Sequence, residues 1–414
     1  MPRLACAALL SMALHAHAAH LRIAAPSDSQ LSVLQQQLVL WQQRTGHTVE
    51  VVKLTNASGD VFVQYRTWLA SKNREIDVYK FDSQWAGQLQ AHLVHLRPYT
   101  QQHERMLPQV VAAWRGRGGA LLGLPYTVGV PQLFYRRDLL EKYGRPVPRT
   151  WAELTDTARL IQQGERAAGR RGFWGYVFQG AVYEGLAANA LEWVASSGGG
   201  RIVEDDGRIS IGNPRAARAL ARAAGWVGAI APRGVLGYKE DDARGVFQTG
   251  NAAFMRHWPA AWALLDGEAG SAVAGRTGIA PLPAGDGGQP AATLGGWGYV
   301  VSKHSPQRDA AAALAVFLSS EEAQRLSAAR SLPPTYAALY DDADLARAAP
   351  LLPALKAALP TLVARPAAPT GRRYPEVSAE FQSAVHRVLE GRDDAAGAVE
   401  KLQRRLERVR GAGW

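Results

Sequence analysis

The chain has 414 residues, of which 47% are hydrophobic and 20% charged, and its formal net charge is +11. This length exceeds one compact core and predicts two or three domains, while the composition excludes a disordered polyelectrolyte. No long apolar run follows the N-terminus, which excludes a polytopic membrane protein. The basic residues are dispersed as pairs such as Arg136-Arg137 and Arg170-Arg171. We interpret the charge as solvated surface and expect no nucleic-acid partner, with a basic nucleic-acid or polyanion binder as an alternative.

Residues 1–18 have the layout of a secretory signal peptide. Arg3 precedes an apolar stretch, and Ala16-His17-Ala18 forms a small-x-small cleavage site. Cys6, the single cysteine, lies in this leader, so cleavage would leave a chain of charge +10 with no disulfide and no thiolate metal ligand. The alternative is a short N-terminal helix of the fold. The sequence therefore predicts an exported, soluble protein of the periplasm.

Strands and helices alternate in the first hundred residues. Short apolar strands are expected at 21–25, 49–54 and 76–81, with an amphipathic helix at 31–44 and a second helical stretch ending near residue 71. Strands that alternate with helices predict an α/β fold with a parallel, doubly wound sheet and right-handed crossovers.

Later helices carry signals at their N-termini. Thr150–Glu153 and Ser319–Glu322 read as capping boxes, and Asn213-Pro214 places a proline at the first helical position. Near the C-terminus, two apolar stripes at helical spacing predict helices that face a core. The stripes are Val377, Phe381, Val385 and Val388, and Val399, Leu402, Leu406 and Val409.

Stretches rich in proline and glycine divide the chain. They occur at 123–125, 281–290 and 332–334, and each is a candidate crossing between domains. We therefore expect one lobe from 19–125 with 281–334 and a second from 126–280 with 335–414.

Small polar residues follow the first three predicted strands. They are Pro26-Ser27-Asp28, Thr55-Asn56 and Asp82-Ser83-Gln84-Trp85. Ligands of open parallel sheets meet the carboxyl ends of the strands. These residues suit a neutral polyhydroxyl ligand better than a phosphate, which favours a glycine-rich loop.

Motifs for catalysis, metals and cofactors are absent from the sequence. There is no Gly-x-Ser-x-Gly, His-Glu-x-x-His, Walker loop or complete Gly-x-Gly-x-x-Gly. Acidic pairs such as Asp241-Asp242 read as solvated turns. We therefore expect no catalytic residue, no cofactor and no metal. A secreted glycosidase that uses Asp82 with Glu184 remains an alternative, since that chemistry needs two carboxylates.

Several phrases, in one order along residues 20–395, together resemble a known family. They include GLPYTVGVPQLFYRRDLLEKY (123–143), FQGAVYEGLAANALE (178–192), FQTGNAAFMRHWPAAW (247–262) and LGGWGYVVS (294–302), with Thr150–Leu154 and Arg365-Pro366 completing the set. They resemble the extracytoplasmic solute-binding proteins of carbohydrate ABC importers, the family of maltose- and trehalose/maltose-binding proteins. The phrase at 178–192 is closest to the trehalose/maltose branch.

This resemblance implies a two-lobed periplasmic binding protein fold. Each lobe would be a mostly parallel sheet flanked by helices, with crossing strands as a hinge. It also implies a disaccharide ligand (trehalose before maltose), permease subunits of an ABC importer as partners, and a monomer without enzymatic activity. The expected substrate-binding residues are Asp28, Gln30, Asp82, Tyr126, Tyr183, Glu184, Trp258, Gly295, Gly296, Trp297 and Arg365.

Simpler roles remain open for some of these residues. Trp258 and Trp297 could be plain core residues, as we expect for Trp114 and Trp226. Asp82 could cap a helix, Glu184 could only complement a helix dipole, and Arg365 could be a surface cation. In addition, the family's acidic residue after the hinge tyrosine is Gly129 here, so a hydroxyl clamp is missing or supplied elsewhere.

Overall fold

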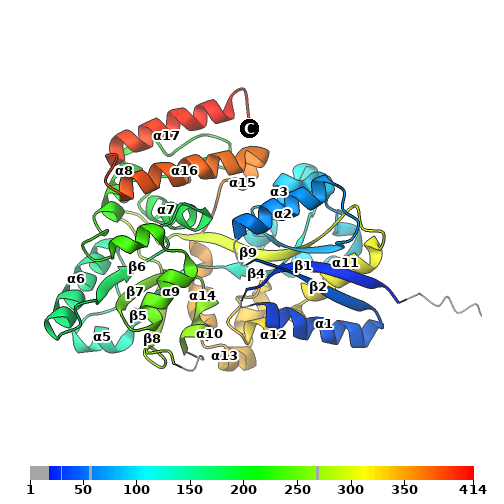
Figure 1. Ribbon diagram of the computed structural model, residues 1–414, viewed down its shortest axis with the longest axis horizontal. Coiled ribbons are helices and arrows are strands. Elements are labelled where there is room, and N and C mark those ends of the chain that lie inside the picture. Colours follow the sequence, from blue (N-terminus) through cyan, green and yellow to red (C-terminus); the bar gives the residue numbers. More distant parts are fainter. Residues whose placement is uncertain (1–17, 29, 56–57, 267–269) are drawn as a thin grey trace, which may run out of the picture.

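The computed structural model describes residues 18–28, 30–55, 58–266 and 270–414. The predicted signal peptide, with Cys6, lies outside the described residues except for Ala18. Asn56, one of the polar residues expected after the second strand, also lies outside them. The chain forms two α/β lobes, each built on its own sheet (Figure 1). The expected two-lobed fold is confirmed.

The first lobe contains a six-stranded sheet in the order β10-β9-β3-β1-β2, with β4 paired to β9. β1 is parallel to β2 and β3, whereas β9 is antiparallel to β3 and β4. The strands are β1 (His20–Pro26), β2 (Thr48–Leu54), β3 (Val78–Asp82), β4 (Leu124–Gly129), β9 (Ala292–Val301) and β10 (Leu362–Ala364).

Helices of the first lobe bury the apolar faces expected from their periodicity. In α1, Leu34, Leu38 and Trp41 lie in the core, and the helix ends where Gly46 takes a left-handed conformation. The helices are α1 (Leu31–Thr45), α2 (Ser58–Ala70), α3 (Ala86–Leu89), α4 (Pro108–Ala112), α11 (Arg308–Leu318), α12 (Glu321–Ala328), α13 (Ala343–Ala348) and α14 (Leu352–Ala358).

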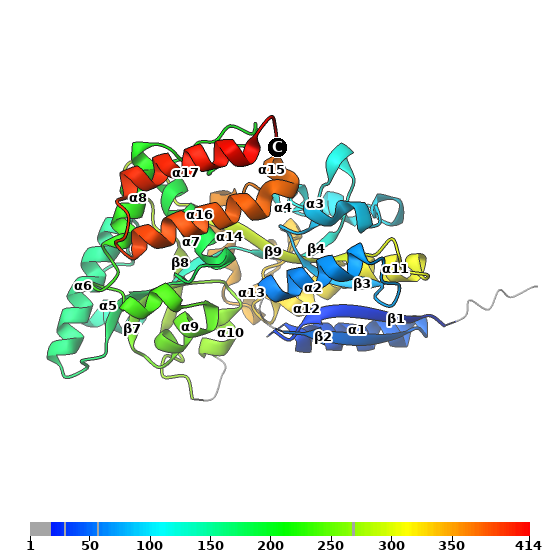
Figure 2. The same cartoon turned by 45° about the horizontal axis from the view of Figure 1, so that its top comes forward.

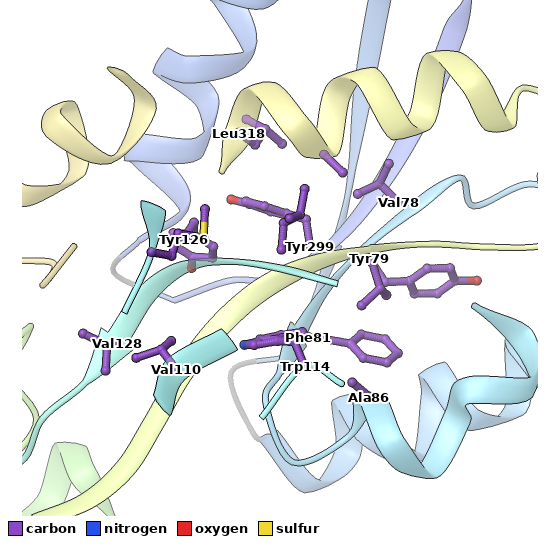
Figure 3. Close-up of a cluster of buried hydrophobic side chains, with 14 of the residues drawn as sticks. Val78, Tyr79, Phe81, Ala86, Val110, Trp114, Tyr126, Val128, Tyr299 and Leu318 are labelled. Atoms are coloured by element: carbon purple, nitrogen blue, oxygen red, sulfur yellow. The ribbon is translucent and has the colours of Figure 1, made fainter. Parts of the chain in front are cut away.

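Aromatic residues pack on both faces of this sheet. Phe81, Trp114 and Tyr299 lie among aliphatic side chains of β3, β4 and α4 (Figure 3). Trp114 is only 1% exposed, as expected for a packing residue.

The second lobe contains a four-stranded sheet in the order β6-β7-β5-β8. Its strands are β5 (Gln132–Arg136), β6 (Trp174–Val177), β7 (Ala252–His257) and β8 (Thr277–Pro281). β5 is antiparallel to both β7 and β8, and only β6 and β7 are parallel. The expectation of a mostly parallel sheet is therefore wrong for this lobe, because β5 enters it from the other lobe in the opposite direction.

Helices cover the second sheet, and several begin as the sequence predicts. Thr150 and Glu153 form the capping box of α6, and the Asn213 side chain caps α8. The helices are α5 (Arg137–Lys142), α6 (Trp151–Ala167), α7 (Glu184–Ser196), α8 (Pro214–Ala224), α9 (Glu240–Gln248), α10 (Ala261–Asp266), α15 (Ala367–Thr370), α16 (Tyr374–Leu389) and α17 (Ala395–Arg410).

The C-terminal helices complete the second core. The apolar stripes of α16 and α17 are buried together with Trp151, Trp193 and Trp226, except that Val409 is only partly buried. The helix of Ser319–Glu322 differs from the expected capping box. It begins one residue later, and Ser320 caps it by accepting a hydrogen bond from the N–H of Ala323.

The chain crosses between the lobes along adjacent strands. β4 leads directly into β5, and β8 returns through 282–291 to β9, which Figure 1 shows running from the second lobe into the first. Of the expected crossings, 123–125 lies at the start of β4 inside the first sheet, so the chain leaves that sheet only after Gly129. The segment 281–290 still contacts the second lobe through Ala284 and Thr150, and the chain returns along β9.

The third expected crossing, at 332–334, lies inside the first lobe. Tyr336, Leu339, Leu352 and Leu355 pack into the first core, so the assignment of 335–414 to the second lobe is wrong for the segment 336–358. These side chains are apolar, and they pack against the same core as α12, the helix that precedes them. The chain instead returns to the second lobe through β10, after which α15 and the start of α16 lie near α3 (Figure 2).

Candidate functional site

A cavity of about 390 Å³ lies between the two lobes. The first lobe contributes the start of α2 and the segment after β3, and the second contributes the starts of α7, α9 and α16. This volume is within the range of small-molecule sites, about 300–1,000 Å³. The lining residues are Ser58, Gly59, Asp60, Phe62, Asp82, Gln84, Trp85, Gln88, Tyr183, Glu184, Lys239, Glu240, Tyr374, Pro375, Ser378, Ala379 and Gln382.

Asp82 stands at the carboxyl end of β3 and faces the second lobe. The backbone N–H of Gln84 donates to its Oδ1 atom over 3.0 Å, and Arg365 Nη2 lies 3.7 Å from the same oxygen. Burial raises the pKa of Asp82 above its ordinary value, although the Arg365 guanidinium opposes this shift.

Glu184, the first residue of α7, is the centre of a hydrogen-bond network. Arg365 Nη1 donates over 2.8 Å and Ser378 Oγ over 2.6 Å, and the Tyr374 hydroxyl donates as well. Arg365 thus connects a carboxylate of each lobe and is buried, which excludes the surface-cation interpretation. Because protein donors occupy both oxygens of Glu184, its main contribution is to hold Arg365 and Tyr374 in place.

Two polar atoms near this network are buried without a partner. Among the described residues, Gln84 Oε1 and Arg365 Nε are buried and accept or donate no hydrogen bond. Buried polar atoms are nearly always satisfied by protein or by solvent or ligand. Gln84 lines the cavity, so a polar ligand there would lie beside its unpaired Oε1 atom, whereas Arg365 is not among the lining residues.

Trp258 follows β7 and is partly buried. Its Nε1–H donates to Glu240 Oε1 over 3.3 Å, and the Tyr183 hydroxyl donates to the other oxygen of Glu240 over 2.8 Å. The edge of the Trp258 ring approaches the backbone of Gly129 and Gly295, where an added Cβ atom would be 3.0 and 2.8 Å from ring carbons. Glycine at both positions leaves room for this ring.

Trp297 lies in β9, opposite Asp82 of β3. Its ring makes an edge contact with the cavity-lining Trp85 at 5.6 Å, and the Lys80 ammonium lies 4.9 Å from its centre. Gly296 has φ of +141°, and an added Cβ would be 2.5 Å from the Thr127 carbonyl oxygen. Only glycine fits this close approach of β4 and β9.

Of the eleven expected site residues, only Asp82, Tyr183 and Glu184 are among those that line the cavity. The others are Asp28, Gln30, Tyr126, Trp258, Gly295, Gly296, Trp297 and Arg365. Asp28 accepts a hydrogen bond from the buried Lys80 ammonium over 2.5 Å, and Gln30 accepts one from the Tyr126 hydroxyl. Tyr126 is 4% exposed and stacks on Tyr299 at 4.8 Å within the core shown in Figure 3. These contacts support the sheet beneath the cavity.

The cavity also contains residues that the sequence analysis missed. Lys239 and Glu240 begin α9, next to the acidic pair interpreted as a solvated turn, and Tyr374 begins α16. No local signal identifies them, because they reach the cavity only through packing of distant helices. The sequence predicts Trp85 only as part of the polar segment that follows the third strand. In the structure it lines one wall of the cavity together with Phe62, and their ring centres are 5.5 Å apart.

The described residues contain no group of three or more His, Cys, Asp or Glu side chains arranged to hold a metal ion. Nor does any helix in the described ranges combine the length and apolar character needed to cross a membrane.

An interlobe cavity with hinge strands defines a ligand-binding protein of two lobes, and sequence comparison gives its family. Residues 25–325 match the bacterial extracellular solute-binding proteins, and the chain belongs to this family. The resemblance noted in the sequence is confirmed at this level.

Relatives cover nearly the whole chain. A protein of Deinococcus radiodurans described as a "probable ABC transporter-binding protein" is 42% identical over 378 residues, which are 90% of this chain and 89% of that protein. The solved structure of maltose-bound MalE3 of T. maritima is 33% identical, with a TM-score of 0.88, and covers 95% of this chain and 100% of that one. A ribitol-bound solute-binding protein of Agrobacterium radiobacter is 23% identical, covers 94% and 98% of the two chains, and has a TM-score of 0.82, which supports the fold alone.

Proposed function

We propose that this protein captures a disaccharide, trehalose or maltose, between its lobes and delivers it to the membrane permease subunits of an ABC importer. The observation that carries the proposal is the composition of the interlobe cavity. Aromatic rings of Phe62, Trp85 and Tyr374 stand beside fixed polar groups of Asp82 and Gln84. A sugar presents apolar C–H faces that rings cover and hydroxyls that such groups bind.

The relatives support the choice of ligand and transport system. The 33% identical structure holds maltose, and the 42% identical protein is described as an ABC transporter-binding protein. Trehalose is supported by the phrase at 178–192, which contains Tyr183 and Glu184 of the cavity. We further propose export to the periplasm by the signal peptide at 1–18 and action as a monomer without catalysis.

The proposed mechanism is capture followed by closure. The walls of the cavity belong to different lobes, and β4 and β9 connect these lobes. A ligand that contacts both walls favours the closed arrangement, in which Asp82, Arg365 and the partly exposed rings of Trp258 and Trp297 surround the sugar. The closed protein then presents both lobes to the permease.

Isothermal titration calorimetry with trehalose, maltose, sucrose and maltotriose tests the proposal. We expect binding of at least one disaccharide, with little dependence on salt, because the ligand carries no charge. Absence of binding by every sugar would overturn the proposal. Release of glucose from trehalose or maltose would instead support the glycosidase alternative.

A further inference from the structure

A fully buried ion pair lies behind Trp258. Arg256 of β7 and Glu192 of α7 are both 0% exposed, with 2.9 Å between Arg256 Nε and Glu192 Oε2 and a second bond from Nη2 to Oε1. Gln179 Oε1 accepts from Arg256 Nη1 over 3.2 Å, and the N–H of Thr293 in β9 donates to Glu192 over 3.3 Å. The two charges are therefore compensated and held on several sides.

Such a pair is weak evidence for stability. The cost of removing two charges from water offsets most of their attraction, and apolar residues of similar size often replace buried pairs without loss. This fully buried pair therefore calls for a contribution other than stability.

The contacts of the Arg256 guanidinium indicate what this contribution is. Arg256 and Trp258 are two positions apart, so their side chains emerge on the same side of the extended chain. The Arg256 Cζ atom lies 4.4 Å from the centre of the Trp258 ring, the distance of a cation–π contact. Glu240 bonds the indole N–H, and Gly129 and Gly295 adjoin the far edge. The ring is thus fixed at one face and two edges.

We propose that Arg256, oriented by Glu192, is a positioning residue that holds the Trp258 ring ready for the ligand before binding. The proposal rests on the proposed function only in taking Trp258 to face a sugar. A ring held in its bound orientation loses less conformational freedom on binding. Immobilising one such side chain corresponds to about a 2- to 10-fold change in affinity.

The test uses the double variant Arg256→Met/Glu192→Gln, which removes both charges and leaves neither buried alone. The matched control is Arg136→Met/Asp138→Asn, which removes another two-bond arginine pair where β5 ends and α5 begins, away from Trp258. All proteins are labelled with 5-fluorotryptophan, and the Trp258 line in the fluorine NMR spectrum is assigned with Trp258→Leu.

We expect the Trp258 line to shift and broaden in the ligand-free double variant and to stay unchanged in the control. Sugar affinity should fall about 2- to 10-fold, and the same two substitutions should cause no further loss in the Trp258→Leu background. An unchanged Trp258 line, or an equal loss in that background, would overturn the inference.

Two further outcomes are distinguished by the design. If the parent protein binds no sugar, the proposed function fails, while the ligand-free Trp258 line still tests the positioning by Arg256. If the double variant does not fold, Arg256→Lys replaces it. Lysine keeps a charge beside Glu192 but loses the planar fork, so the Trp258 line should again broaden.

Discussion

Tryptophan side chains in this protein have two different environments. Trp114, Trp151, Trp193 and Trp226 are at most 1% exposed, whereas Trp258 and Trp297 are only partly buried and adjoin the interlobe cavity or its wall. A partly exposed ring beside a cavity contributes its open face to a ligand, and a buried ring contributes to the free energy of unfolding.

Replacing Trp258 or Trp297 with Ala should therefore lower sugar affinity more than stability. We expect a loss of about 10-fold or more, because an aromatic contact contributes about 0.5–1.5 kcal/mol beyond the area it buries. Trp226→Ala is the control and should cost about 3–5 kcal/mol of unfolding free energy. Calorimetry and urea denaturation measure the two quantities. Normal affinity in both cavity variants would contradict the assignment.

Asp82 should make stability and binding respond to pH in opposite directions. Burial raises its pKa above the ordinary value of about 3.9, so the folded chain binds this proton more tightly than the unfolded chain. Between the two pKa values the native state binds more protons, and the Asp82 contribution to the free energy of unfolding falls as pH rises. Sugar affinity should instead fall as pH is lowered, because protonation weakens the charge-assisted hydrogen bonds of Asp82.

Asp82→Asn supplies the comparison, since asparagine does not titrate. Urea denaturation and calorimetry over a pH series should give a difference between parent and variant confined to this window. If both proteins lose affinity equally on acidification, Asp82 is not the titrating group.

Among single residues, sequence reasoning succeeded where the signal is local. Asp82, Gln84 and Trp85 follow a recognisable strand and line the cavity. Asp28 also follows a strand, but it is paired with Lys80 from the neighbouring strand. Nothing near Asp28 in the sequence indicates that pairing, because it depends on which strands become neighbours.

At the scale of elements, the pairing of β4 with β9 determines the shape of the hinge. Gly129 pairs with Gly295 and Val128 with Gly296, so the two backbones approach closely where the lobes join. Introducing Asp at position 129 would place its Cβ 3.0 Å from both Gly295 and the Trp258 ring. Gly129, in place of the family's acidic residue, therefore leaves room for the Trp258 ring.

Gly296→Ala should be among the more harmful single-methyl changes in the chain. Its φ of +141° and the 2.5 Å approach of a Cβ to the Thr127 oxygen combine strain with overlap. We expect a loss of roughly 1–3 kcal/mol from the backbone conformation alone. Gly287→Ala is the control, because its φ is +66° and nothing lies within 4 Å of an added Cβ. Equal melting temperatures for the two variants would contradict the overlap.

Helices were predicted better than strand pairings for a physical reason. The α1 face and the stripes of α16 and α17 follow from spacing within one segment, and their buried sides are as expected apart from the partly buried Val409. The antiparallel pairing of β5 with β7 and β8 depends on residues more than a hundred positions apart. Local periodicity contains no information on that choice.

At the scale of the whole molecule, a ligand that binds only the folded protein should stabilise both lobes together. At a free ligand concentration 100 times the dissociation constant, binding raises the free energy of unfolding by about 2.7 kcal/mol. For lobes of this size we expect an increase of several degrees in the melting temperature with trehalose or maltose. Scanning calorimetry over a sugar concentration series measures it. A protein that melts identically with every disaccharide would contradict the proposed function.

Closure of the lobes is the remaining whole-molecule prediction. Val63 on α2 and Val182 beside Tyr183 are 51% and 55% exposed and belong to opposite sides of the cavity. Residues 19–414 contain no cysteine, so Val63→Cys and Val182→Cys can carry a pair of spin labels in that part of the chain without other changes. Because a sugar that contacts both walls shifts the population toward the closed arrangement, the distance distribution between the labels should narrow and shorten when the sugar binds.

A pair within the first lobe, Val63→Cys with Val39→Cys, should give one distribution with and without sugar, since both positions belong to helices of that lobe. If calorimetry detects binding while the interlobe distribution stays unchanged, the ligand binds without closure, and the capture mechanism must be replaced by a rigid site.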